Sequence, residues 1–247
     1  MALPIPTWAR PVGLAFFFLW SLFAGAASTF HVSPVRVELA AGRGSAALTV
    51  RNDGNAPTVI QTQVVAWSQQ NGEDVYTPTN EVLATPPIFT VAPGAIQIAR
   101  VALRRQPDAG RELAYRIFLQ EVPGPPRPGF QGAQLALRIS IPIFVEAKKP
   151  QALKLDWSAQ REPGGALRLF LNNVGGKHVQ VYDLNISSAA EAGPVYSNQS
   201  ASYVLPGQRR SWMLKPLERR TLAGDRVRVT AATDAGRVET EIVLESP

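Results

Sequence analysis

The residue types that most often carry out enzyme chemistry are few in this chain and are not grouped. It has no cysteine and two histidines, His31 and His178, neither of which has a metal-ligating companion at a useful spacing. The nucleophile motif G-x-S-x-G, the zinc motif H-E-x-x-H and the phosphate-binding loop are all missing, and the carboxylates are dispersed. We therefore expect both histidines to lie at the surface, and we expect no metal, no cofactor and no enzymatic activity.

The basic residues raise a nucleic acid as a partner. The chain has 25 Lys and Arg against 19 Asp and Glu, a net charge of +6. These cations are scattered along the sequence, and the short clusters are Arg104–Arg105, Lys148–Lys149, Arg209–Arg210 and Arg219–Arg220. A predicted export signal also separates the protein from cytosolic nucleic acid. We expect no nucleic-acid partner, and a basic surface that helps solubility or attracts acidic partners.

That export signal is read from the first 27 residues. A segment with one positive charge, Arg10, precedes a short apolar run, LAFFFLWSLFAGA, with small residues at its end. This order is typical of a secretory signal peptide, with cleavage near Ala26 or Ala27. The apolar run is shorter than the roughly 20 residues that a membrane-spanning helix needs. Residues 1–27 are therefore predicted to be removed, which leaves an exported protein with no stable insertion in the membrane.

One later stretch, QLALRISIPIFVEA (residues 134–147), alternates apolar and other side chains with unusual regularity. Alternation with a period of two predicts a β-strand, and by periodicity alone the simpler interpretation is a strand with one face in its own core. Pro142 lies inside the stretch and cannot donate to a sheet, so it indicates an edge. An apolar edge is a hazard unless another chain covers it, as in β-augmentation.

Short alternating segments separated by Pro and Gly turns run from Phe30 to the C-terminus. About seven predicted strands precede Lys148, which is the spacing of an immunoglobulin-like sandwich. The charged, proline-bearing segment EAKKPQ (residues 146–151) then interrupts the pattern, and strand signals resume after it. The sequence predicts an all-β chain with domains over residues 28–147 and 153–247, joined by a linker over 148–152.

Four segments resemble one known family over nearly the whole mature length. They are SPVRVEL (residues 33–39), ATPPIFTVAPGAIQIARV (84–101), RELAYRIFLQEVP (111–123) and the stretch 134–147. The family is that of the periplasmic chaperones of chaperone–usher pili, and the archaic subclass is the more similar. The resemblance implies two immunoglobulin-like β-sandwich domains set at an angle, with an interdomain cleft. It also implies a periplasmic protein that lends its strand G1 to an incomplete pilus subunit and delivers that subunit to an outer-membrane usher.

The same resemblance implies which residues bind the subunit. The donor strand would place alternate side chains in the subunit's groove: Ala133, Leu135, Leu137, Ile139 and Ile141. The subunit's C-terminal carboxylate would be bound by Arg36, which matches the family's arginine on the first strand, because a guanidinium donates two parallel hydrogen bonds. The family's second anchor, a lysine on G1, corresponds to Pro142 here, and we expect Arg116 to replace it, with Arg138 as the weaker alternative.

The family also has a buried ion network between its domains. The residues that match this network are Arg100, Glu112 and Asp225, the last in a weakly aligned region. Such a network fixes the angle between domains rather than adding much net stability.

Two alternatives remain open from the sequence. A secreted β-sandwich adhesin or carbohydrate-binding module would have aromatic clusters in its loops, whereas Trp67, Trp157 and Trp212 are far apart in the sequence. The free protein could also cover its edge by self-association through strand G1.

Overall fold

The computed structural model describes residues 30–40, 42–125, 133, 135–188, 193–217, 222 and 224–245. The predicted signal peptide, residues 1–27, lies outside these ranges. Within them the chain forms β-strands and one short 3-10 helix, η1 (Pro163–Gly165), so the all-β prediction is confirmed. None of the helical structure in these ranges is long and apolar enough to cross a membrane.

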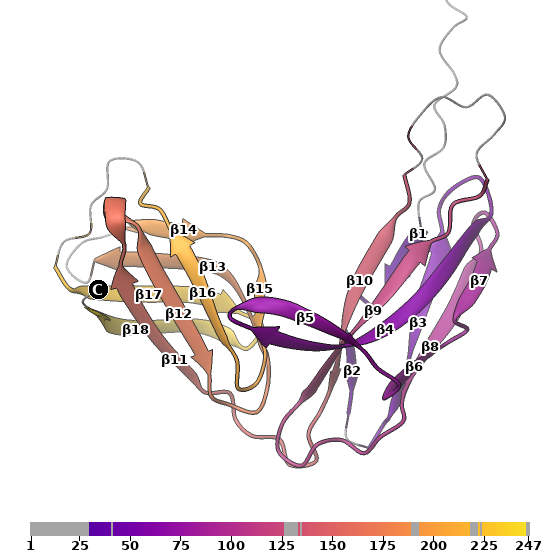
Figure 1. Ribbon diagram of the computed structural model, residues 1–247, viewed down its shortest axis with the longest axis horizontal. Coiled ribbons are helices and arrows are strands. Elements are labelled where there is room, and N and C mark those ends of the chain that lie inside the picture. The colour runs from indigo at the N-terminus through magenta and orange to yellow at the C-terminus, as the bar shows by residue number, and fades with distance from the viewer. Residues whose placement is uncertain are drawn as a thin grey trace, which may run out of the picture.

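The first part of the chain forms two sheets that pack face to face (Figure 1). One sheet has the order β1 (Phe30–Ser33), β3 (Ser45–Asn52), β8 (Ile96–Leu103) and β6 (Val82–Thr85). The other has the order β2 (Val37–Leu39), β10 (Arg138–Val145), β9 (Leu113–Glu121), β4 (Thr58–Gln70) and β5 (Glu73–Pro78), with β7 (Ile88–Val91) paired to β4. Alternate side chains of β9 and β10, among them Ile117 and Ile143, fill the core between the sheets.

The second part of the chain forms another sandwich with a separate core. Its strand order is β14 (Tyr196–Asn198), β13 (Val179–Ser188), β17 (Arg226–Thr233), β18 (Gly236–Glu245), β11 (Leu155–Arg161), β12 (Leu167–Asn173) and β16 (Arg209–Leu214). The short strand β15 (Ser202–Val204) also pairs with β13. No strand spans residues 146–154 of the described chain, and we keep 148–152 as the proposed linker.

Strand β10 is shorter than the alternation in the sequence predicts. It begins at Arg138, four residues after Gln134. Arg138 pairs with Gln120 of β9, and β9 ends at the next residue, Glu121, so β9 offers no partner for a longer β10. Strand β2 covers the other side of β10 only at residues 143–145. Among the described strands, none pairs with that side of residues 138–142, so Pro142 lies on an edge as predicted.

The two sandwiches meet at their lower ends in Figure 1, where they form a V. Strands β4, β9 and β10 lie on the side of the first sandwich that is turned toward the second (Figure 1). A small apolar cluster joins the two: Trp67 and Phe144 from the first sandwich pack with Leu205 and Tyr203 from the second. We call these four residues the junction cluster.

Candidate functional site between the sandwiches

One face of the sheet β2–β10–β9–β4–β5 looks toward the second sandwich, and we call it the inner face. Because side chains alternate along a strand, the inner face receives Arg116 and Phe118 from β9 while their neighbours point into the core. Pro142 lies directly opposite Arg116 on the neighbouring strand, and Ser140 lies opposite Phe118. Arg116, which is predicted to replace the family's lysine, is therefore the cross-strand partner of Pro142, the position that the resemblance aligns with that lysine.

The guanidinium of Arg116 lies near aromatic side chains of both sandwiches. Its guanidinium carbon is 4.0 Å from the centre of the Trp67 ring and 5.7 Å from that of Tyr203. One terminal nitrogen donates to the Ser140 hydroxyl over 3.4 Å, and the buried Nε has no hydrogen-bond partner. Stacking of this kind orients the guanidinium without using its N–H groups, so this cation retains donors for an anionic ligand.

Arg36, the other predicted anchor, is already paired. Its guanidinium lies 2.8 Å from Oδ2 of Asp234 in the second sandwich and 3.1 Å from Oε1 of Glu38. Burial disfavours its charge, but the two carboxylates outweigh this and raise the pKa of Arg36. Burial likewise raises the pKa of Tyr203, and the positive charges of Arg36 and Arg116 oppose that rise, which places both arginines near this tyrosine.

The ion network between the sandwiches is centred on His178, which we expected at the surface. The ring is almost fully buried; its Nδ1 contacts Glu112, and its Nε2 lies 3.4 Å from Oδ2 of Asp234. Asp234 continues the network to Arg36. Phe144 stacks on the imidazole, with ring centres 3.5 Å apart and planes inclined by 8°. Two residues from each sandwich thus make up the network, with His178 and Asp234 of the second between Glu112 and Arg36 of the first.

Two of the three residues predicted for this network are wrong. Asp225 precedes β17 and Asp234 follows it, so a strand of eight residues, about 26 Å long at 3.3 Å per residue, separates them. Asp225 instead lies 3.8 Å from Arg161. Arg100 is exposed on β8, which belongs to the other sheet of the first sandwich. Only Glu112 is in the interdomain network as predicted.

The position of His178 depends on two preceding glycines. A Cβ on Gly175 would lie 2.6 Å from the carbonyl oxygen of Ala152, and one on Gly176 would lie 2.6 Å from that of Gly110. The turn therefore packs directly against backbone from the loop before β9 and from the segment before β11. The amide of Glu112 also donates to the carbonyl of Gly176. The glycine pair predicts a turn from sequence, but not what packs against it.

Gln69 makes a polar contact between the sandwiches. Its side-chain amide donates to the carbonyl of Tyr203 over 2.9 Å, and its side-chain oxygen accepts from the amide of Leu205 over 3.0 Å. Gln69 is buried, so both groups are satisfied in a region that excludes water. The sequence offers no signal for this role, because a glutamine near a strand end is usually exposed.

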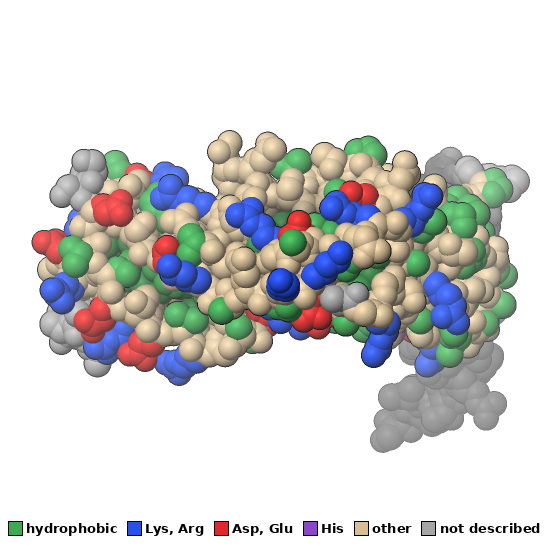
Figure 2. Space-filling model, turned by 90° about the horizontal axis from the view of Figure 1, so that it is seen from below, with side chains coloured by type: hydrophobic (Ala, Val, Ile, Leu, Met, Phe, Trp, Pro, Cys, Tyr) green, Lys and Arg blue, Asp and Glu red, His purple; other side chains and the backbone are tan. Residues whose placement is uncertain are grey.

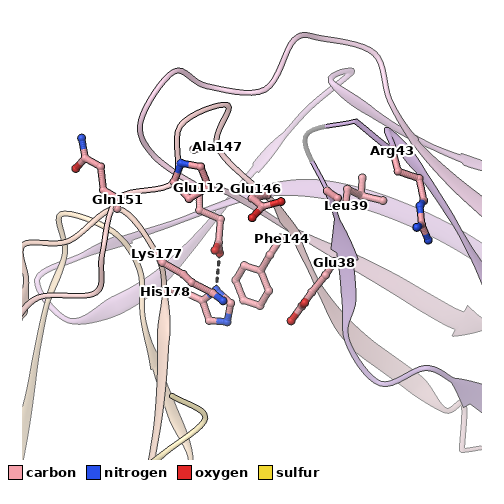
Figure 3. Close-up of a pocket in the computed structure, with 13 residues that line it drawn as sticks. Glu38, Leu39, Arg43, Glu112, Phe144, Glu146, Ala147, Gln151, Lys177 and His178 are labelled. Atoms are coloured by element: carbon pink, nitrogen blue, oxygen red, sulfur yellow. Dashed lines mark hydrogen bonds and ion pairs between the residues drawn. The ribbon is translucent and has the colours of Figure 1, made fainter. Parts of the chain in front are cut away.

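A cavity of about 270 Å³ lies where the sandwiches meet (Figure 3). Glu112, Phe144 and His178 form part of its wall, and Glu146 and Lys177 come from the loops that follow β10 and β12. Arg116 is not among the residues that line this cavity. The cavity therefore does not include the predicted carboxylate anchor.

The predicted donor residues divide into two groups. Leu135 is 86% exposed and Leu137 is 38% exposed, and Ala133 is exposed as well. Ile139 is half-buried, whereas Ile141 is buried in the core of its own sandwich. Ile139 and Ile141 share one face of β10, and the apolar residues at alternate positions continue in the sequence before the strand begins.

The junction is expected to lose stability as the pH rises. Burial lowers the pKa of His178, but the contacts of its ring with the carboxylates of Asp234 and Glu112 outweigh burial, so the pKa is raised above its ordinary value. A group with a raised pKa stabilises the fold fully below its unfolded-state value and stops doing so as the pH rises through the folded-state value. We expect the midpoint of thermal unfolding to fall as the pH is raised from 6 to 9. His178→Gln should remove this dependence, and an unchanged pH profile in that variant would contradict it.

The sequence of the first sandwich matches a protein-family model. Residues 29–154 match the model described as the pili and flagellar-assembly chaperone, PapD N-terminal domain. The chain belongs to this family. It is thus a chaperone of pilus assembly, and its family is one of chaperones rather than of enzymes. The chaperone is 25% identical over 226 residues to chaperone protein FimB/FhaD of Bordetella pertussis, with 85% of this chain and 84% of the relative covered.

Solved structures of similar chaperones confirm the two-sandwich, immunoglobulin-like fold. CsuC, in its pre-assembly complex with the tip subunit CsuE of the archaic Csu pili of Acinetobacter baumannii, superposes with a TM-score of 0.64 at 20% identity, covering 89% of this chain and 99% of that one. DraB of E. coli superposes with a TM-score of 0.58 at 21% identity, covering 87% and 97%. SafB of Salmonella enterica, in complex with the SafA pilin, also gives 0.58 at 19% identity, covering 87% and 96%.

Proposed function

We propose that this chaperone binds an incomplete pilus subunit in the periplasm by donor-strand complementation and delivers it to an outer-membrane usher. The observation that carries the proposal is the exposure of Leu135 and Leu137, which extend the apolar row of β10 beyond its own core. Full burial of two leucine side chains contributes up to about 3–6 kcal/mol. The side of residues 138–142 that has no paired strand also offers backbone hydrogen bonds to a client strand.

Ile141 contributes to this proposal in a different way from the leucines. Because it is buried in the chaperone's own core, it holds the donor strand in place rather than entering the client. The donating side chains are then Ala133, Leu135 and Leu137, with Ile139 at the border between the two cores. Export through the predicted signal peptide belongs to the same proposal, as does assignment to the archaic subclass.

Arg116 is the proposed anchor of the subunit's C-terminal carboxylate. It is stacked in place on Trp67 and retains N–H donors, whereas Arg36 is already bound by Asp234 and Glu38. A carboxylate would have to displace those acidic partners to reach Arg36, which lowers the net gain. Arg36 in this proposal contributes positive potential beside Tyr203 and links the two sandwiches through its ion pair with Asp234.

Co-expression with a candidate pilus subunit tests the proposal. We expect Arg116→Ala to lower the subunit recovered with the chaperone at least about tenfold, because truncating one partner of a buried charged pair costs about 2–5 kcal/mol. The matched control is Arg100→Ala, since Arg100 is an exposed arginine on the other sheet. Equal recovery with Arg116→Ala and Arg100→Ala would refute the anchor, and no recovery with the unaltered chaperone would refute that subunit as a client.

The alternative of a carbohydrate-binding module has less support. Trp67 is in the junction cluster, Trp212 is buried, and Trp157 packs against Trp212 with ring centres 6.3 Å apart. These three side chains therefore do not form an exposed platform on which a sugar ring could stack.

A further inference from the structure

Four loops meet at the base of the V, and we call them the elbow loops. They are residues 40–44, 104–112, 146–154 and 174–178, of which Ala41 lies outside the described ranges. Backbone hydrogen bonds join them: the amide of Lys148 donates to Asp108 over 2.9 Å, and that of Val174 donates to Lys154 over 2.9 Å. The cavity of Figure 3 brings Arg43 to the same place as Glu146 and Lys177. The elbow loops thus form one continuous end of the molecule.

These loops carry most of the net charge of the protein. They contain eight Lys and Arg and three Asp and Glu, so they account for +5 of the chain's net +6. The eight cations are all exposed: Arg43, Arg104, Arg105, Arg111, Lys148, Lys149, Lys154 and Lys177. Figure 2, which views the molecule from below, shows several Lys and Arg side chains across the middle of that face. Cations that are scattered in sequence are therefore gathered by the fold.

The acidic residues of the elbow loops leave most of this charge unopposed. Glu112 is bound to His178, and Asp108 accepts hydrogen bonds from the backbone amides of Gly110 and Arg111. Among the eight cations, Arg105 forms an ion pair, with Glu81 over 2.7 Å, and the other seven form none with described residues. These seven charged groups are therefore exposed to solvent and available to an anionic ligand.

The elbow lies at the opposite end of β10 from the donor residues. Leu137 immediately precedes the strand and Glu146 immediately follows it, so they lie about 30 Å apart along an extended chain. Figure 1 shows the elbow loops at the bottom of the V and the start of β10 near the top. A surface bound at the elbow would therefore leave the donor residues free.

We propose that the elbow loops dock this protein on a bilayer that contains anionic phospholipid. Exposed Lys and Arg side chains on several loops suit a fluid layer of phosphate groups, because each adds attraction without a fixed partner geometry. Val174, an aliphatic side chain 49% exposed among these cations, can enter the interface. The elbow loops contain no Phe, Tyr or Trp on which a nucleic-acid base could stack. Docking in this orientation presents the donor strand away from the membrane.

Vesicle binding by the protein purified after export tests the proposal. We expect sedimentation with vesicles of phosphatidylcholine containing 30% phosphatidylglycerol, and none with phosphatidylcholine alone. The variant Lys148→Ala, Lys149→Ala, Lys177→Ala should bind about 100-fold more weakly, at roughly 1 kcal/mol for each cation near an anionic surface. The matched control is Arg226→Ala, Arg237→Ala, Lys215→Ala, which removes three exposed cations of the second sandwich. It should bind within about twofold of the unaltered protein.

Three outcomes would overturn the proposal. Absence of binding to the phosphatidylglycerol vesicles at low salt is the first. Equal losses in the elbow and control variants would mean that total charge, and not the elbow, attracts the protein. Binding to polyglutamate that depends on the three elbow lysines, without binding to vesicles, would identify an acidic protein as the partner instead. Circular dichroism of each variant shows whether it is folded.

Discussion

Replacing Leu135 and Leu137 together with arginine is expected to abolish recovery of a pilus subunit while leaving the chaperone's own stability unchanged. Both side chains are exposed, so their replacement removes little from the core of the first sandwich. In the complex, each arginine would instead have to enter an apolar groove, where an unpaired charge costs far more than the leucine contributed. The readouts are the amount of subunit recovered on co-expression and the thermal unfolding of the free variant.

The matched control for this variant lies on the other sheet of the same sandwich. Ile96 and Ile98 on β8 are 60% and 49% exposed, and they alternate like the two leucines. Replacing both with arginine should leave subunit recovery unchanged. If the β8 variant loses as much subunit as the leucine variant, the loss reflects surface charge, and the donor role of β10 is wrong. A leucine variant that still recovers subunit would reject the proposal directly.

The fold could be predicted from the sequence because the strands of a sandwich are indicated by patterns among neighbouring residues. Alternation of side chains and Pro-Gly turns depend on neighbours within a few residues, and they predict about seven strands before Lys148, where the described part of the chain has ten; β5 and β6 were missed. The start of β10 was misplaced because it is set by where β9 ends, at Glu121. The end of a paired strand depends on its partner as well as on its own residues.

The site was predicted less completely, for a related reason. Arg116 was proposed from the family resemblance, which aligns the family's lysine with Pro142, and the structure adds that these two positions are cross-strand partners. His178 was not recognised, because its environment comes from Glu112, Phe144 and Asp234, which are distant in sequence. Asp225 and Asp234 both flank β17, and composition alone does not show which end of that strand faces the first sandwich.

The other large effect is expected from Phe144→Ala, which removes the central side chain of the junction. Phe144 is 2% exposed, stacks on His178, and lies 5.8 Å from Trp67 and 5.6 Å from Tyr203 between ring centres. Truncating a buried phenylalanine costs about 3–5 kcal/mol through lost transfer energy and the cavity left behind. Urea denaturation should measure this loss, and Phe144→Leu should recover part of it, because leucine fills much of the volume without the stacking.

This variant also tests whether the junction fixes the angle of the V. The junction cluster is small, and β10 joins it to the donor residues: Phe144 is the penultimate residue of the strand, at the junction, and Arg138 begins the strand at the donor end. Loss of the aromatic contact should let the sandwiches move apart, so the radius of gyration from small-angle X-ray scattering should increase. Subunit recovery should then fall as well, because Arg116, the proposed carboxylate anchor, lies between Trp67 of the first sandwich and Tyr203 of the second. An unchanged radius of gyration with a loss below about 1 kcal/mol would show that the Gln69 and Glu112 contacts hold the angle without Phe144.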